Sequence, residues 1–252
     1  MRNLILTFFL LISNITFSQE LYINSEPASL IPKGSKVVRL KYSNIKRSES
    51  LFYNIIKPSI SYGISKNIMI SAMFQFSNEY SFNGFSIYSK QRIFSSDRQK
   101  YHSRFSSYFR GSYHDKKYLI NSLDLEFQDT GLEFGFIGTQ LINKLAVSLT
   151  SGLGIYTKQK LNSLQNTLSI GYLLLPRSYK SYKQTNFNLY FEVMTNAILD
   201  KVIPRTLSKF SSTLAPGIQL IFFSRSRLDF SYRIRKATNS NDFLIKLSYI
   251  IY

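Results

Sequence analysis

The side chains of this sequence that could do chemistry are mostly basic. The chain carries 32 Lys and Arg against 14 Asp and Glu, a formal net charge of +18, with two His and no Cys. Without Cys, thiol nucleophiles, disulfides and Cys-ligated metal centres are excluded. A basic excess of this size is typical of proteins that bind nucleic acids, anionic membranes or acidic solutes. The residue types therefore favour binding of anions over acid–base catalysis.

One short motif could serve a hydrolase. His114 and Asp115 are adjacent, and Asp124, Glu126 and Asp129 follow them. A catalytic His needs a separate carboxylate that orients it and a nucleophile or water within reach, and neighbouring residues seldom orient each other in this way. The three later carboxylates are spaced only loosely for calcium and lack the Gly of an EF-hand loop. We expect no enzyme activity, no cofactor and no metal site.

The N-terminus indicates that the chain is exported. A basic start precedes an apolar run from Leu4 to Ile12, and Thr16 and Ser18 place small residues at the positions that precede a cleavage site. We interpret residues 1–18 as a cleaved signal peptide and residues 19–36 as an N-terminal periplasmic segment. Export makes nucleic acid an unsuitable partner, and the sequence contains neither a recognition-helix pattern nor a zinc finger.

The rest of the chain alternates apolar and polar residues with a period of two, as half-buried strands do. No uninterrupted apolar run reaches the roughly 20 residues of a membrane-spanning helix. Twelve alternating stretches are found near residues 37–45, 55–64, 67–77, 84–94, 103–113, 131–142, 144–156, 166–175, 184–196, 213–223, 228–236 and 242–252. One face of each is rich in Phe, Leu, Ile and Tyr, and the other is rich in Ser, Gly, Asn and charged residues.

This pattern predicts an all-β fold, a transmembrane antiparallel up-and-down β-barrel of about 12 strands, with a range of 10–14, over residues 37–252. A membrane barrel places apolar side chains on lipid and polar ones inside. The alternative, a soluble β-sandwich or lipocalin-like barrel, encloses an apolar core that these polar faces do not suit. The longest connections, 114–130 and 197–212, both fall on the side expected for extracellular loops.

Several stretches resemble a family of uncharacterised outer-membrane proteins of Bacteroidota. They are Glu26–Ser29 after the signal, Ser86–Lys90, Ile137–Leu141, and Gly171–Pro176 with Ser181–Asn186. The resemblance implies an outer-membrane location and a barrel fold, and it implies no activity. For such a protein we expect outer-membrane lipid, lipopolysaccharide phosphates and other outer-membrane proteins as partners.

The strand register decides which charges face the lumen. Nine bases fall on the inward face: Arg39, Lys41, Lys90, Arg92, Arg104, Arg110, Arg233, Arg235 and Lys246. Three acids share that face and are expected to be their partners: Glu133, Glu192 and Asp229. Closure of the barrel makes the first, eleventh and twelfth strands neighbours, so that five of the nine bases lie on one wall. The fourth and fifth strands carry the other four.

Three functions fit this arrangement. Rows of Arg and Lys in a wet lumen lower the free energy of a permeating anion, which makes a narrow, anion-preferring passive pore the first hypothesis. In the second, long Arg side chains and their acidic partners fill a barrel of intermediate width, and the protein is a non-conducting structural or accessory subunit of an outer-membrane complex. A barrel hydrolase is the third and weakest.

Overall fold

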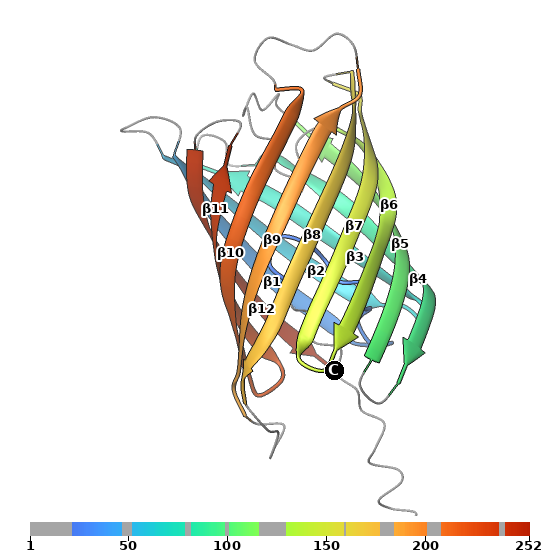
Figure 1. The fold of residues 1–252 in the computed structure, drawn as a ribbon. Coiled ribbons are helices and arrows are strands. Elements are labelled where there is room, and N and C mark those ends of the chain that lie inside the picture. The colour runs from blue at the N-terminus through green and yellow to red at the C-terminus, as the bar shows by residue number, and fades with distance from the viewer. Residues whose placement is uncertain are drawn as a thin grey trace, which may run out of the picture.

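The chain forms one closed barrel of twelve antiparallel strands (Figure 1). The computed structural model describes residues 22–46, 52–78, 82–98, 101–115, 130–158, 160–176, 184–200, 208–236 and 240–252. The strands are β1 (Lys36–Lys46), β2 (Phe52–Gly63), β3 (Ile68–Ser77), β4 (Gly84–Asp97), β5 (Tyr101–His114), β6 (Gly131–Ile142), β7 (Leu145–Tyr156), β8 (Leu161–Leu175), β9 (Asn186–Ile198), β10 (Phe210–Phe222), β11 (Ser226–Arg235) and β12 (Ser240–Ile251). The predicted fold class and strand number are confirmed.

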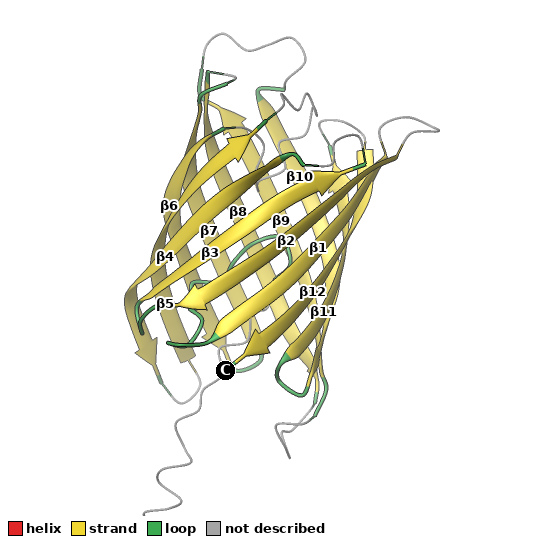
Figure 2. Ribbon diagram, turned by 180° about the vertical axis from the view of Figure 1, so that it is seen from behind, coloured by secondary structure: helices red, strands yellow, loops and turns green. Residues whose placement is uncertain are grey.

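Every strand pairs with its neighbours in sequence, and β1 closes the barrel against β12, as the view from behind also shows (Figure 2). Lys36 of β1 stands opposite Ile251 of β12, so β1 begins at the end of the barrel where β12 finishes. No helix among the described residues is long and apolar enough to cross a membrane.

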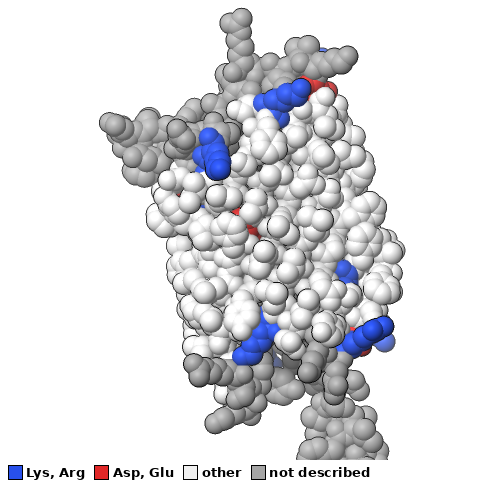
Figure 3. Space-filling view, viewed as in Figure 1, with Lys and Arg blue, Asp and Glu red and all other residues white. Residues whose placement is uncertain are grey.

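The outer surface of the barrel is apolar. Ile87, Leu149 and Phe136 are each more than half exposed at 58%, 55% and 53%, and they belong to a band of Phe, Leu, Ile and Tyr around the wall. On the face shown in Figure 3, charged side chains lie mostly near the two ends of the barrel. Such a surface suits hydrocarbon rather than water, and it confirms the predicted inside-polar, outside-apolar register.

Several strands begin earlier than the alternation indicated, and the difference is largest at β8. β8 starts at Leu161 rather than near residue 166. At its first residues the polarity is reversed, because Leu161 is buried inside the barrel while Asn162 is exposed outside. Beyond the hydrocarbon layer nothing requires an apolar outer face, so the strand continues where the sequence pattern does not reveal it.

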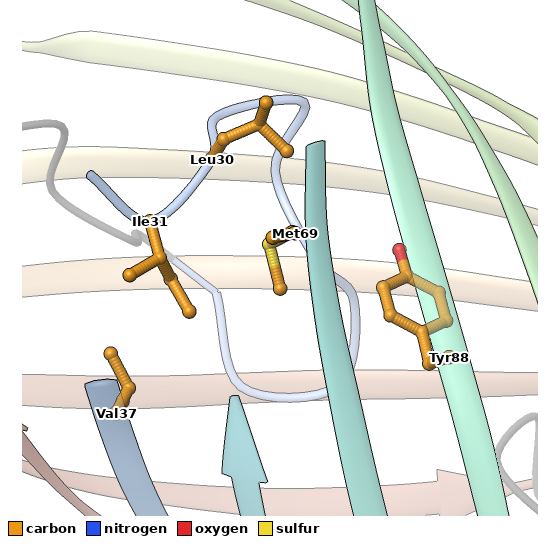
Figure 4. Close-up of a cluster of buried hydrophobic side chains, with 5 residues drawn as sticks. All are labelled: Leu30, Ile31, Val37, Met69 and Tyr88. Atoms are coloured by element: carbon orange, nitrogen blue, oxygen red, sulfur yellow. The ribbon is translucent and has the colours of Figure 1, made fainter. Parts of the chain in front are cut away.

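The N-terminal segment, residues 22–35, lies inside the barrel. Its residues from Tyr22 to Ile31 are buried or half-buried. The sequence predicted an N-terminal periplasmic segment over 19–36, and the strands enclose the part of it that the structure describes. Leu30 and Ile31 point toward Val37, Met69 and Tyr88 of the wall, as Figure 4 shows. The apolar core of this protein is therefore small, and the N-terminal segment builds much of it.

A tight turn connects the N-terminal segment to β1. The amide of Ser35 donates to the carbonyl of Pro32 at 3.1 Å, and Gly34 has φ +82°, a left-handed conformation that glycine adopts without strain. The turn rests on Gly63 at the end of β2, where a Cβ would come within 2.1 Å of the Pro32 carbonyl oxygen. Glycine at position 63 is thus required for the segment to seat against the wall.

Candidate functional site

All the charges expected in the lumen lie on the inner face of the barrel. Of the nine bases, six are buried and Arg92, Arg104 and Arg110 are half-buried, and the three acids Glu133, Glu192 and Asp229 are buried. The structure adds two inner bases, Lys57 and Arg227, and two inner acids, Glu26 and Asp242. Within the described ranges, eleven inner bases therefore face five inner carboxylates.

Two bases of β11, Arg233 and Arg235, pair with an acid that the sequence analysis did not predict. Asp242 accepts a bond from Arg233 Nε at 3.0 Å and lies in contact with the Arg233 Nη2 atom. Arg235 Nη2 is 3.3 Å from the same carboxylate. Arg233 and Arg235 are 2% and 3% exposed, so this group is closed off from water and serves as wall structure. Asp242 is four residues before the inward-facing Lys246, so the alternation of β12 already placed this acid on the inner face.

Three lysines form a row across neighbouring strands nearer the middle of the barrel. Lys41 of β1 stands opposite Lys246 of β12 on one side and opposite Lys57 of β2 on the other. Each is less than a tenth exposed. Asp229 is 3.4 Å from Lys246. Because like charges directly opposite one another are unfavourable in a sheet, this lysine row (Lys41, Lys57 and Lys246) favours acidic neighbours, and Asp229 is one of them.

The predicted basic ladder on β4 and β5 binds the N-terminal segment. Lys90 Nζ lies 3.0 Å from the carboxylate of Glu26 and 2.8 Å from the carbonyl of Pro27. Arg104 donates to Ser29 Oγ at 2.9 Å. Arg39, from β1 on the adjoining wall, is 3.7 Å from the Glu26 carboxylate. Two walls of bases thus converge on one acid of the chain's own N-terminal segment.

Two other ladder residues remain within the wall. Arg110 forms an ion pair with Glu133 at 2.9 Å, as the sequence analysis expected for that acid, and its guanidinium lies 5.2 Å from the centre of the Tyr88 ring. Tyr156 also donates to Glu133 at 3.1 Å. Arg92 is half-buried on the inner face of β4.

Glu192 holds the opposite side of the N-terminal segment. One carboxylate oxygen accepts bonds from the amide and the side-chain nitrogen of Asn24, at 2.9 and 2.8 Å. The other accepts from the amide and hydroxyl of Ser25, at 2.9 and 2.7 Å. Lys246 donates to the carbonyl of Tyr22 at 2.9 Å. Glu192 therefore binds the segment, and it is not simply the partner of a lumen base.

Beside the segment the lumen retains a cavity of about 60 Å³. Its walls include five bases, which are Arg39, Lys41, Lys57, Arg110 and Lys246. On its other side lie Tyr22, Ile23, Ser25, Glu26 and Pro27 of the N-terminal segment. Among the described residues that line this cavity, Glu26 is the one carboxylate. The cavity is large enough for a few water molecules, and five of the side chains that line it are basic.

Solved outer-membrane channels share this architecture. The KdgM porin aligns with TM-score 0.57 at 9% identity, over 86% of this chain and 99% of that chain. The NanC porin gives 0.56 at 10% identity, over 84% and 98%. An outer-membrane channel from Pseudomonas putida F1 gives 0.56 at 9% identity, over 91% and 100%. The chain has the fold of outer-membrane porins.

Sequence comparison adds nothing to this likeness. No family model matches the chain, and no curated protein is similar to it. KdgM has also been solved in complex with disordered oligogalacturonate, and that structure aligns with TM-score 0.54 at 10% identity. At such identities the likeness defines the fold alone.

The residues considered for a hydrolase are not arranged as a catalytic pair. His114 ends β5 with 0% exposure and its Nε2 is 3.3 Å from Gln75 Nε2, whereas the neighbouring Asp115 is exposed. Asp124, Glu126 and Asp129 lie outside the described residues. Among the residues that the structure describes, no group of three or more His, Asp or Glu could hold a metal ion.

Proposed function

We propose that this protein is an outer-membrane channel with a preference for anions, and that its N-terminal segment closes the lumen in the state described here. The observation that carries the proposal is the charge of the interior. Among the described residues eleven inner bases face five inner carboxylates, and a cavity beside the segment is lined by five bases. Bases on the wall of a water-filled pore attract anions and repel cations.

The porin fold and the charge of the cavity support the same proposal. KdgM, which has this fold, was solved with oligogalacturonate, a polymer of sugar carboxylates. A lumen lined by Lys and Arg suits solutes of that charge. We place the protein, after removal of residues 1–18, in the outer membrane of a Bacteroidota bacterium, on the resemblance of stretches such as Glu26–Ser29.

Exposed bases near the ends of the barrel support anionic lipids as partners. Lys36, Arg98, Arg225 and Lys236 are exposed near the ends of strands, outside the apolar band. We propose that such residues contact lipid headgroups and lipopolysaccharide phosphates, which are anionic.

Recordings in planar bilayers test the channel. We expect little conductance from the wild type, and a larger one from a variant in which residues 22–31 are replaced by Gly and Ser. In a salt gradient, the reversal potential of the variant should shift toward the equilibrium potential of the anion. Lys41→Gln with Lys57→Gln, in the same background, should reduce that displacement. Lys36→Gln, at an exposed position, is the matched control and should not change it.

The second candidate is the non-conducting accessory subunit. It is favoured by the closure of the lumen, since the N-terminal segment bonds to both walls and leaves a cavity of about 60 Å³. The same recordings separate the two candidates. The variant with Gly and Ser at residues 22–31 should still shift its gel mobility on heating, as a folded barrel does. If this folded variant shows no conductance in bilayers, the channel is excluded. A preference for cations would exclude the anion selectivity.

A further inference from the structure

A carboxylate already occupies the positive centre of the lumen. The Glu26 side chain lies 3.0 Å from Lys90 Nζ and 3.7 Å from Arg39 Nη1. Lys90 is 1% exposed and Arg39 7%, so both charges are held in place by the wall. The two cations thus contact different oxygens of the same carboxylate. Glu26 therefore marks where such a group binds in this barrel.

The lysine row extends this site beyond Glu26. Lys41, Lys57 and Lys246 line the same cavity as Glu26 and Arg39, and Lys41 stands opposite both of the others. Against these bases the described lining of the cavity contributes one carboxylate. Three wall lysines thus lie beside the position that Glu26 occupies, and one of them, Lys246, is also 3.4 Å from Asp229.

The volume of the cavity makes the segment and a soluble anion mutually exclusive. About 60 Å³ remains beside the segment, whereas pockets for small organic ligands measure roughly 300–1,000 Å³. A sugar acid or a similar solute can reach Arg39 and Lys90 only after Glu26 has moved away. Two ligands that compete for one site are linked, so each lowers the occupancy of the other.

The contacts of the segment suit such competition. Residues from Asn24 to Ser29 bond to the walls through polar and charged groups, including the 2.7 Å bond from Ser106 Oγ to the carbonyl of Ala28. The apolar contacts of Leu30 and Ile31 lie next to the turn that leads into β1. An anion that takes over the bases thus removes bonds from the middle of the segment and leaves its attachment to the wall.

We propose that the lumen contains a carboxylate-binding site formed by Arg39, Lys90 and the lysine row, that Glu26 fills it in the closed state, and that soluble organic carboxylates open the barrel by displacing Glu26. The proposal rests on the channel function above and names the ligand class and regulation of the same lumen. Its consequence is that solute binding and opening of the lumen are one event.

Accessibility of the wall beneath the segment tests this without any measurement of conductance. The protein has no Cys, so Ser106→Cys introduces a single thiol at a position with 0% exposure, covered by Ala28. We expect glucuronate to accelerate labelling of this reporter thiol by a soluble maleimide at least about tenfold at saturation, which corresponds to about 1.4 kcal/mol of preference for the open state. Glucose, its neutral counterpart, should have no effect.

The second part of the labelling experiment removes the carboxylate of Glu26. In Glu26→Gln the reporter thiol should react fast without glucuronate, and glucuronate should add little. Asp200→Asn removes a carboxylate that accepts from Asn162 Nδ2 at 3.0 Å at the end of β9, and it should leave the labelling rate at the reference value. If Ser106→Cys does not fold, Ser148→Cys, 1% exposed and bonded to Thr139, replaces it as the reporter.

The outcomes separate this inference from the channel itself. Equal labelling in glucuronate and glucose, or an unchanged rate in Glu26→Gln, would overturn competition at the site even if the barrel conducts anions. Accelerated labelling in a barrel that stays silent in bilayers would support the site and exclude the channel.

Discussion

Glu192 gives the sharpest test of how the N-terminal segment is held. Its carboxylate is fully buried and accepts two bonds from Asn24 and two from Ser25. In Glu192→Gln one oxygen becomes an NH₂ group, which cannot accept and which faces N–H donors of the segment. The barrel wall itself should change little, because the new side chain has almost the same size.

The expected size of the effect follows from the bonds lost. One oxygen of Glu192 carries two bonds from the segment, and a hydrogen bond to a charged group contributes about 1.5–3 kcal/mol. At the lower figure the closed state loses about 3 kcal/mol, which raises the ratio of displaced to seated segment roughly 100-fold. Labelling of the reporter thiol at position 106 in the absence of any solute should rise accordingly.

Glu133→Gln is the matched control, since it makes the same change at another buried carboxylate of the inner wall. Glu133 bonds to Arg110 and Tyr156, which belong to the wall strands β5 and β7. If Glu192→Gln labels no faster than Glu133→Gln, the segment is not anchored through Glu192.

Two glycine substitutions probe the segment and the wall separately. In Gly63→Ala the new Cβ would come 2.1 Å from the Pro32 carbonyl oxygen, and overpacking of this kind costs about 1–3 kcal/mol, so the segment should unseat and the reporter thiol should label faster in a barrel of normal heat stability. In Gly135→Ala the Cβ would come 2.2 Å from the backbone oxygen of Ser151 on the next strand, so the temperature at which gel mobility changes should fall. Gly138→Ala, whose nearest atom is 3.9 Å away, is the control for both, and a response equal to it would contradict either prediction.

The barrel and its inner face could be predicted because lipid imposes a simple rule on the sequence. An outward side chain in hydrocarbon must be apolar, so Phe230 and Ile234 fix the parity of β11 and place Arg233 and Arg235 inside. The same rule ends where the lipid ends, which is why the start of β8 was missed. Lys57 lies on the same face of β2 as Ile55 and Ser61, which point inward. It was not predicted because the adjacent Pro58 interrupts the alternation.

The position of the N-terminal segment could not be predicted in this way. Its bonds join residues far apart in sequence, such as Asn24 and Glu192, which are separated by 168 positions, and no local period encodes such a pair. One signal was nevertheless present. Nine inward bases against three inward acids left positive charge in the predicted lumen without a partner, and Glu26 was an acid in the neighbouring segment that could reach it.

In the closed state the acid of the N-terminal segment and the lysine row line one cavity. Glu26 engages Lys90 and Arg39, and the lysine row lines the same cavity from β1, β2 and β12. Closure and anion recognition therefore depend on the same side chains, and a change in one must alter the other.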